Sequence, residues 1–239
     1  MDKDVFMLFD RMARINHSCR PNVYVGYCKA HRRATTHAIR DIEKGEELVL
    51  SILKYYGDVY TREEVCEMHS FRCRCELFDK NAPTFKETET TWWALWKDNG
   101  LFDVLMKYLV PDVPDDPIAF MLAPPPPPEV DRPPFFAAMC EVCQSMVGRL
   151  ESLGMGEDDK IRKWCNWSSY AAEANGDLAK AVRYRLRALN IDKAIKGEDH
   201  EDYFWTRLHL QYLALARSSR VVGRRRIRRS SCVSFGPTS

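Results

Sequence analysis

Residues 14–28 read RINHSCRPNVYVGYC, a polar motif that runs directly into a segment rich in β-branched and aromatic residues. Two further segments of this composition follow, ATTHAI at residues 34–39 and ELVLS at residues 47–51. Short runs of this kind, separated by charged and glycine-containing turns, are typical of β-strands. We therefore predict three short strands, over residues 22–28, 34–39 and 47–51, in a small sheet of three or more strands.

Beyond residue 87 the apolar residues take up a helical spacing. The tryptophans and leucines of residues 92–108 predict one or two amphipathic helices, with a break near Asn99. Four more helices are predicted, over residues 135–153, 160–175, 178–196 and 201–217. Asp177 is placed to cap one of them, and Gly197 to end it. The predicted fold class is α+β, with a partial β-fold at the N-terminus followed by an α-helical region.

Proline and arginine mark the remaining boundaries. Residues 111–134 hold most of the 13 prolines, which cannot donate backbone hydrogen bonds, and they predict an exposed loop. The stretch RSSRVVGRRRIRR at residues 217–229 is strongly cationic and predicts a disordered tail. The expected organisation is an N-terminal unit at 1–80, a helical connector at 87–110, the Pro-rich loop at 111–134, a helical region at 135–217 and a basic tail at 218–239.

The composition limits the classes of partner. The chain has 239 residues, and its 36 Lys and Arg nearly balance 34 Asp and Glu, which argues against nucleic-acid binding outside the basic tail. The apolar runs are too short for a membrane span, and the acidic N-terminus is unlike a signal peptide. We therefore expect a nuclear or cytoplasmic protein that meets a protein substrate or partner. In such compartments its nine cysteines are free, packed in a core or metal-bound rather than paired as disulfides.

Three short motifs occur in order along the N-terminal third: RINHSCRPN at 14–22, DIEKGEEL at 41–48 and FRCRC at 71–75. Together they resemble the C-terminal half of a SET domain and its post-SET segment, in particular those of the SET-and-MYND type and its fungal relatives. The resemblance implies a protein lysine methyltransferase that uses S-adenosylmethionine. Residues 176–192 resemble the second half of a tetratricopeptide repeat, which fits the helical region that follows the SET core in this type.

The resemblance implies a methyl-donor site around the NHSC motif. Asn16 and His17 match the pair that lies against S-adenosylmethionine in the family, where the Asn amide and neighbouring backbone groups hydrogen-bond the cofactor. Phe71 matches an aromatic residue that stacks near the adenine or lines the lysine channel. A side-chain amide and backbone groups at a sharp turn offer the fixed donors and acceptors that such a ligand needs.

The resemblance also implies a zinc site, with one ligand missing. In the family the cysteine of NHSC joins three cysteines of a C-x-C-x-x-C segment; here Cys19, Cys73 and Cys75 match, but Phe78 occupies the last position. The candidates for a fourth ligand are Cys66, His69 and Asp79. With one of them the three thiolates would form a tetrahedral zinc site, and without one they form a reduced, metal-free cluster.

The catalytic residue is left open by the sequence. In the family the strand after GEEL ends in Ser-Tyr, and the tyrosine orients the lysine amine and the transferring methyl group; the matching pair here is Ser51-Ile52. Isoleucine has no hydroxyl, so it cannot take that role in orienting the reactants. Tyr55 and Tyr56, or Tyr60, are weak substitutes through a change of register, and their simpler interpretation is packing at the end of the strand.

The N-terminal half of a SET domain carries a glycine-containing segment that wraps the methionine end of the cofactor. This sequence has fifteen residues before Asn16 and no such segment. Three interpretations therefore stay open. The chain is a methyltransferase with a substitute tyrosine, a truncated and non-catalytic scaffold whose helical region binds a protein partner, or an incomplete gene product whose missing half lies upstream.

Overall fold

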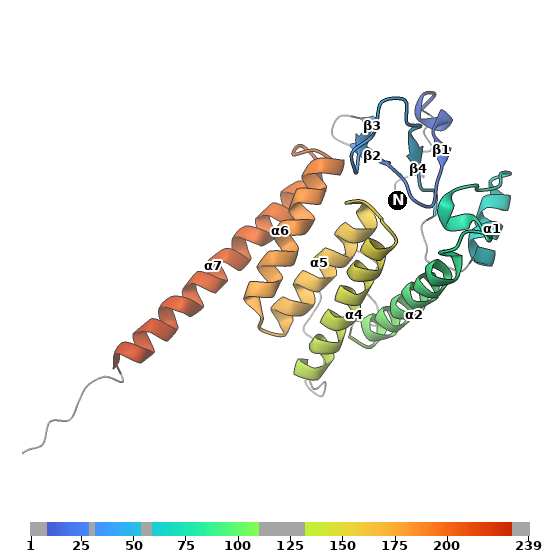
Figure 1. The fold of residues 1–239 in the computed structure, drawn as a ribbon. Coiled ribbons are helices and arrows are strands. Elements are labelled where there is room, and N and C mark those ends of the chain that lie inside the picture. Colours follow the sequence, from blue (N-terminus) through green and yellow to red (C-terminus); the bar gives the residue numbers. More distant parts are fainter. Residues whose placement is uncertain (1–8, 29–31, 54–58, 110–131, 231–239) are drawn as a thin grey trace, which may run out of the picture.

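The computed structural model describes residues 9–28, 32–53, 59–109 and 132–230. Its strands are β1 (Asn16–His17), β2 (Val23–Cys28), β3 (Arg33–Ala38) and β4 (Val49–Leu50). Its α-helices are α1 (Val59–Met68), α2 (Phe85–Leu109), α4 (Arg132–Ser152), α5 (Asp159–Ala174), α6 (Leu178–Ile195) and α7 (Glu201–Ser230). The predicted α+β class is confirmed, because a few short strands precede a mostly helical remainder (Figure 1).

The strands form two separate pairs. β2 and β3 are antiparallel, with Val23 opposite Ala38, whereas β4 pairs in parallel with the short β1, Asn16 opposite Val49. Within the described residues the predicted sheet of three or more strands is therefore wrong: the ELVLS segment joins β1 instead of the hairpin. The strand β1 was not predicted, because two residues are too few to show the alternating pattern by which strands are predicted.

Helices α4, α5, α6 and α7 lie side by side, and α2 packs against α4 (Figure 1). α5 is the centre of this layer, with a continuous buried stretch from Trp164 to Ala172. Local signals fix the helix ends as predicted: the carboxylate of Asp177 accepts a hydrogen bond from the Lys180 N–H, and Gly197 follows α6 at a φ of +91°. No helix within the described ranges combines the length and the apolar character that a membrane crossing needs.

Three boundaries differ from the predictions. α2 runs unbroken through Asn99, whose side chain donates to Asp103 one turn on. α4 begins at Arg132, because prolines are tolerated in the first turn of a helix, while residues 110–131 lie outside the described part. α7 continues to Ser230, so residues 218–230 are helical rather than disordered; arginine is a good helix former and this stretch contains no proline. The proposed domain limits themselves stay predictions.

The β2–β3 hairpin is attached to one end of the helical layer. The ammonium of Lys196 lies 5.9 Å from the centre of the Tyr24 ring and pairs with the carboxylates of Asp159 and Asp202. Arg162 joins the same network, 2.7 Å from Asp159. Burial alone would raise the pKa of Asp159, but the two cations outweigh it and hold the pKa below its usual range. The network is thus a set of charges that are paired at neutral pH among α5, α6 and α7, and the Tyr24 ring of β2 lies against it.

The loop between α4 and α5 passes very close to the end of the hairpin. A Cβ atom on Gly156 would lie 2.6 Å from the carbonyl oxygen of Ile39, which is backbone and cannot move aside. Close by, the guanidinium of Arg20 donates to the carbonyl of Gly154. Glycine is therefore required at residue 156 by the approach of two backbones rather than by its own dihedral angles.

Replacing Gly156 by alanine should separate the hairpin from the helical layer and lower the free energy of unfolding by about 1–3 kcal/mol, the usual cost of overpacking. The matched control is Gly148→Ala in α4, where nothing lies within 4 Å of the new methyl group. That control should stabilise the protein by roughly 0.5–1 kcal/mol through helix propensity. Urea unfolding of both variants measures the difference, and equal midpoints would contradict the close packing.

Candidate functional site

The methyl-donor residues predicted from the NHSC motif lie on β1. Parallel pairing with β4 places Asn16 beside Val49 and His17 beside Leu50. The Asn16 side chain is exposed, and its amide donates to Glu47 Oε1 at 2.6 Å. Its hydrogen-bonding groups thus face the surface, where a ligand can replace the carboxylate.

The His17 ring lies among three elements. Its Nε2 is 3.6 Å from Cys19 Sγ, and its Nδ1 accepts a hydrogen bond from the Ile52 N–H at 3.1 Å. Its centre is 5.3 Å from that of the Phe71 ring, so the structure brings these two predicted site residues together. Burial lowers the pKa of His17, which favours the neutral ring.

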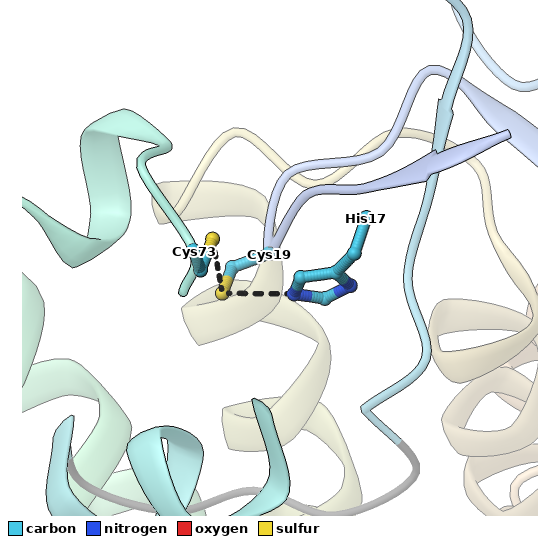
Figure 2. A group of neighbouring side chains, drawn as sticks. All are labelled: His17, Cys19 and Cys73. Carbon is cyan, nitrogen blue, oxygen red and sulfur yellow. Dashed lines mark hydrogen bonds between the residues drawn. The ribbon is translucent and has the colours of Figure 1, made fainter. Parts of the chain in front are cut away.

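The three cysteines predicted as zinc ligands also converge. Cys19 Sγ lies 3.9 Å from Cys73 Sγ, in a buried position where the turn after β1 meets the FRCRC segment (Figure 2). Hydrogen bonding by Cys73 and Cys75 strongly raises the pKa of the Cys19 thiol, and hydrogen bonding by Cys19 and Cys73 lowers the pKa of Cys75. The three thiols therefore titrate as one coupled group, as expected of sulfurs crowded together.

The donor set of this cluster suits zinc. Among the described residues, the side chains whose ligand atoms all lie within 4.8 Å of one another are His17, Cys19 and Cys73. Soft thiolates and an imidazole are the ligands that structural zinc prefers. None of the predicted fourth ligands, Cys66, His69 and Asp79, belongs to that group. His17 was predicted as a cofactor residue, so its place beside the thiols was missed.

Asn22, the last residue of RINHSCRPN, has a structural role that the sequence did not reveal. Its side chain is fully buried and hydrogen-bonds the backbone at β4 as a neighbouring strand would. Nδ2 donates to the Glu47 carbonyl at 2.8 Å, and Oδ1 accepts from the Val49 N–H at 2.8 Å. Its backbone carbonyl accepts from the Ile39 N–H. Asn22 therefore connects β4 to the hairpin and holds the β1–β4 pair in place.

The position of the family's catalytic tyrosine is occupied by Ile52, whose backbone N–H contacts His17. The substitutes Tyr55 and Tyr56 lie outside the described residues, and the side chain of Tyr60 is not described either. A cavity of about 580 Å³ lies next to the cluster, between α1 and residues 71–81. Its wall includes Cys66, Phe71, Arg72, Cys73, Arg74 and Phe78.

Comparison with known proteins agrees with this geometry. Residues 1–52 match the model of the SET domain. Histone-lysine N-methyltransferase set5 of Schizosaccharomyces pombe is 33% identical over 66 residues, which cover 27% of this chain and 21% of that protein. The human histone-lysine N-methyltransferase SMYD3 is 32% identical over 89 residues, covering 36% of this chain and 20% of that protein.

The N-terminal motifs and their arrangement define a segment of a methyltransferase-like fold. Residues 1–52 are similar to a SET domain, as the motif resemblance predicted, and the matched relatives are histone-lysine methyltransferases. It spans about a fifth of the length of these relatives. The activity of these relatives as whole proteins is therefore not assigned to this chain.

Replacing Asn22 by alanine should leave the Val49 N–H without its partner and cost about 1–3 kcal/mol of unfolding free energy. Amide hydrogen exchange at Val49 should accelerate, because β4 loses the side-chain bonds of Asn22 and keeps its backbone bond from the Asn22 N–H to the Val49 carbonyl. Asn81→Ala, at an exposed position, is the control and should change little. Unchanged exchange at Val49 in the Asn22 variant would show that β4 is held by other contacts.

Proposed function

We propose that this chain contributes to an S-adenosylmethionine-binding site of the protein lysine methyltransferase type. The observation that carries the proposal is the packing of the His17 ring against Phe71, since it joins the NHSC and FRCRC motifs, 54 positions apart, at one place. When bound, S-adenosylmethionine would supply an electrophilic methyl group on its sulfonium. The exposed Asn16 amide would bind the donor, and the Phe71 ring would cover an apolar part of it.

The thiol cluster would hold zinc as a structural ion within the same proposal. A zinc ion there would tie the turn after β1 to the FRCRC segment and fix the orientation of Phe71, without entering the reaction. That the chain is truncated or of little activity, and that it is nuclear or cytoplasmic, stay predictions. Ile52 offers no hydroxyl, so the orienting group would have to come from another residue.

Calorimetric titration of the whole chain with S-adenosylmethionine and with S-adenosylhomocysteine tests the donor site. Micromolar binding, on the order of −8 kcal/mol, is expected. Asn16→Ala should remove it, while Asn99→Ala, which changes an exposed asparagine of α2, should not. No heat from a folded sample, or equal affinity in the Asn16 variant, would contradict the proposed role.

A second candidate function, binding of a protein partner by the helical region, is favoured by the outer face of α7. Phe204, Trp205, Leu208 and Tyr212 are each about half exposed, between 46% and 56%, and fall within an arc of about 100° on the helix. The opposite face packs on α6 through Leu213. Because no acidic residue follows Asp202 in the sequence, this face fits an amphipathic protein segment with acidic flanks.

A fluorescent amphipathic peptide built from Leu and Glu tests this surface by anisotropy, against a peptide of the same pattern built from Leu and Lys. The acidic peptide should bind and the basic one should not. The double variant Phe204→Glu, Leu208→Glu should lose binding, whereas Ala214→Glu, on the polar side of α7, should keep most of it. Equal binding of both peptides, or no effect of the double variant, would reject the surface.

A further inference from the structure

We propose that the fourth zinc ligand of this chain is His17, which takes the place of the cysteine that Phe78 replaces. The ligand set would be His17, Cys19, Cys73 and Cys75. The inference rests on the zinc site proposed above and does not depend on methyl transfer. It assigns to the His17 side chain a role that the motif resemblance does not contain.

The distances in the cluster are those of a zinc tetrahedron. Zinc lies about 2.3 Å from sulfur and 2.0–2.1 Å from imidazole nitrogen, so tetrahedral geometry sets the sulfur-to-sulfur edge at about 3.8 Å and the nitrogen-to-sulfur edge at about 3.6 Å. The measured separations are 3.9 Å from Cys19 Sγ to Cys73 Sγ and 3.6 Å from Cys19 Sγ to His17 Nε2. These two edges, which join His17, Cys19 and Cys73, fit as they stand, whereas Cys75 lies outside this close group and has to move toward it when zinc binds.

The local backbone explains why these four residues can act together. In extended backbone, side chains two residues apart point to the same side. The sequence offers two such pairs, His-x-Cys at 17–19 and Cys-x-Cys at 73–75. Cys75 has extended dihedral angles, φ −71° and ψ 161°, and His17 belongs to β1. Each pair would supply two ligands, and Figure 2 shows His17 and Cys73 on either side of Cys19.

The second nitrogen of His17 has to change its hydrogen bond when zinc binds. Without metal, Nδ1 accepts from the Ile52 N–H, so the ring proton is on Nε2 and points at Cys19. Zinc at Nε2 would require that proton on Nδ1, which must then donate to an acceptor. The Ile52 N–H therefore has to release Nδ1 when zinc binds. On binding, the His17 proton moves between its two nitrogens, and the thiols release theirs to solvent.

The other candidates are placed less well. Phe78, at the position of the missing cysteine, turns toward the guanidinium of Arg62, whose carbon lies 5.6 Å from the ring centre. Cys66, His69 and Cys75 all lie outside the close group of His17, Cys19 and Cys73, but Cys75 is in hydrogen-bonding contact with the Cys19 thiol. In addition, ligation through the ring leaves the backbone of His17 available for the methyl donor.

The test measures zinc affinity and coordination in the whole purified chain. Competition with a chromophoric chelator should give one tightly bound zinc per chain, and zinc X-ray absorption should show three sulfurs and one nitrogen. His17→Ala should weaken zinc by more than the roughly 10–100-fold that loss of a second-shell partner costs. His69→Ala, the matched histidine control, should bind like the unmodified chain.

The variant His17→Cys distinguishes loss of a ligand from misfolding, because it replaces the imidazole by a thiolate and gives a set of four cysteines. It should bind zinc tightly and change the absorption spectrum to four sulfurs. The inference is wrong if His17→Ala binds zinc within threefold of the unmodified chain, or if the unmodified chain shows no zinc–nitrogen distance; in both cases the zinc site itself stands. A folded chain that binds no zinc overturns both the site and its fourth ligand, and leaves the methyl-donor proposal to its own titration.

Discussion

The two small β-pairs of the SET segment depend on the helical layer, because a two-stranded sheet by itself is only marginally stable in water. Within the described residues the hairpin shows two kinds of contact with that layer. One is the network in which Lys196 lies over the Tyr24 ring and pairs with Asp159. The other is the close approach of the Gly156 backbone to Ile39. One is electrostatic and one is steric, and together they fix the orientation of the hairpin.

The orientation of the hairpin determines the position of the site through the hydrogen bonds of Asn22. The hairpin presents Asn22 at its start, the side chain of Asn22 holds β4, and β4 holds β1, which carries Asn16 and His17. The cysteine contact then joins this series to the segment that follows α1. The site is therefore assembled from four short pieces of chain, none of which has a stable conformation of its own. A change at the helical layer should reach the site through the same series.

Much of the fold could be predicted because its signals are local. The hairpin strands follow from β-branched composition, and α5 and α6 follow from apolar spacing, the Asp177 cap and Gly197. The errors arise where distant contacts prevail. β1 exists only because β4 pairs with it, and α2 passes through Asn99 and Gly100, since packing against α4 outweighs their weak helix propensity. The end of α7 depends on a balance between repulsion among its arginines and their helix propensity. The charge of the sequence does not reveal that helix propensity prevails as far as Ser230.

The candidate site shows the same division at the level of single atoms. The motifs named Asn16, His17, Phe71 and the three cysteines from their spacing along the chain, and the structure brings His17 to Phe71 and Cys19 to Cys73. The pairing of β1 with β4 determines which neighbour each ring nitrogen of His17 contacts. The motif alone does not predict this pairing. A histidine has two independent hydrogen-bonding parts, its backbone and its ring. The family resemblance implies that backbone groups at this motif bind the methyl donor, whereas the structure places the His17 ring beside the Cys19 sulfur. The two proposed roles use different parts of His17, so Phe78 in place of a cysteine is compatible with both the zinc proposal and the methyl-donor proposal.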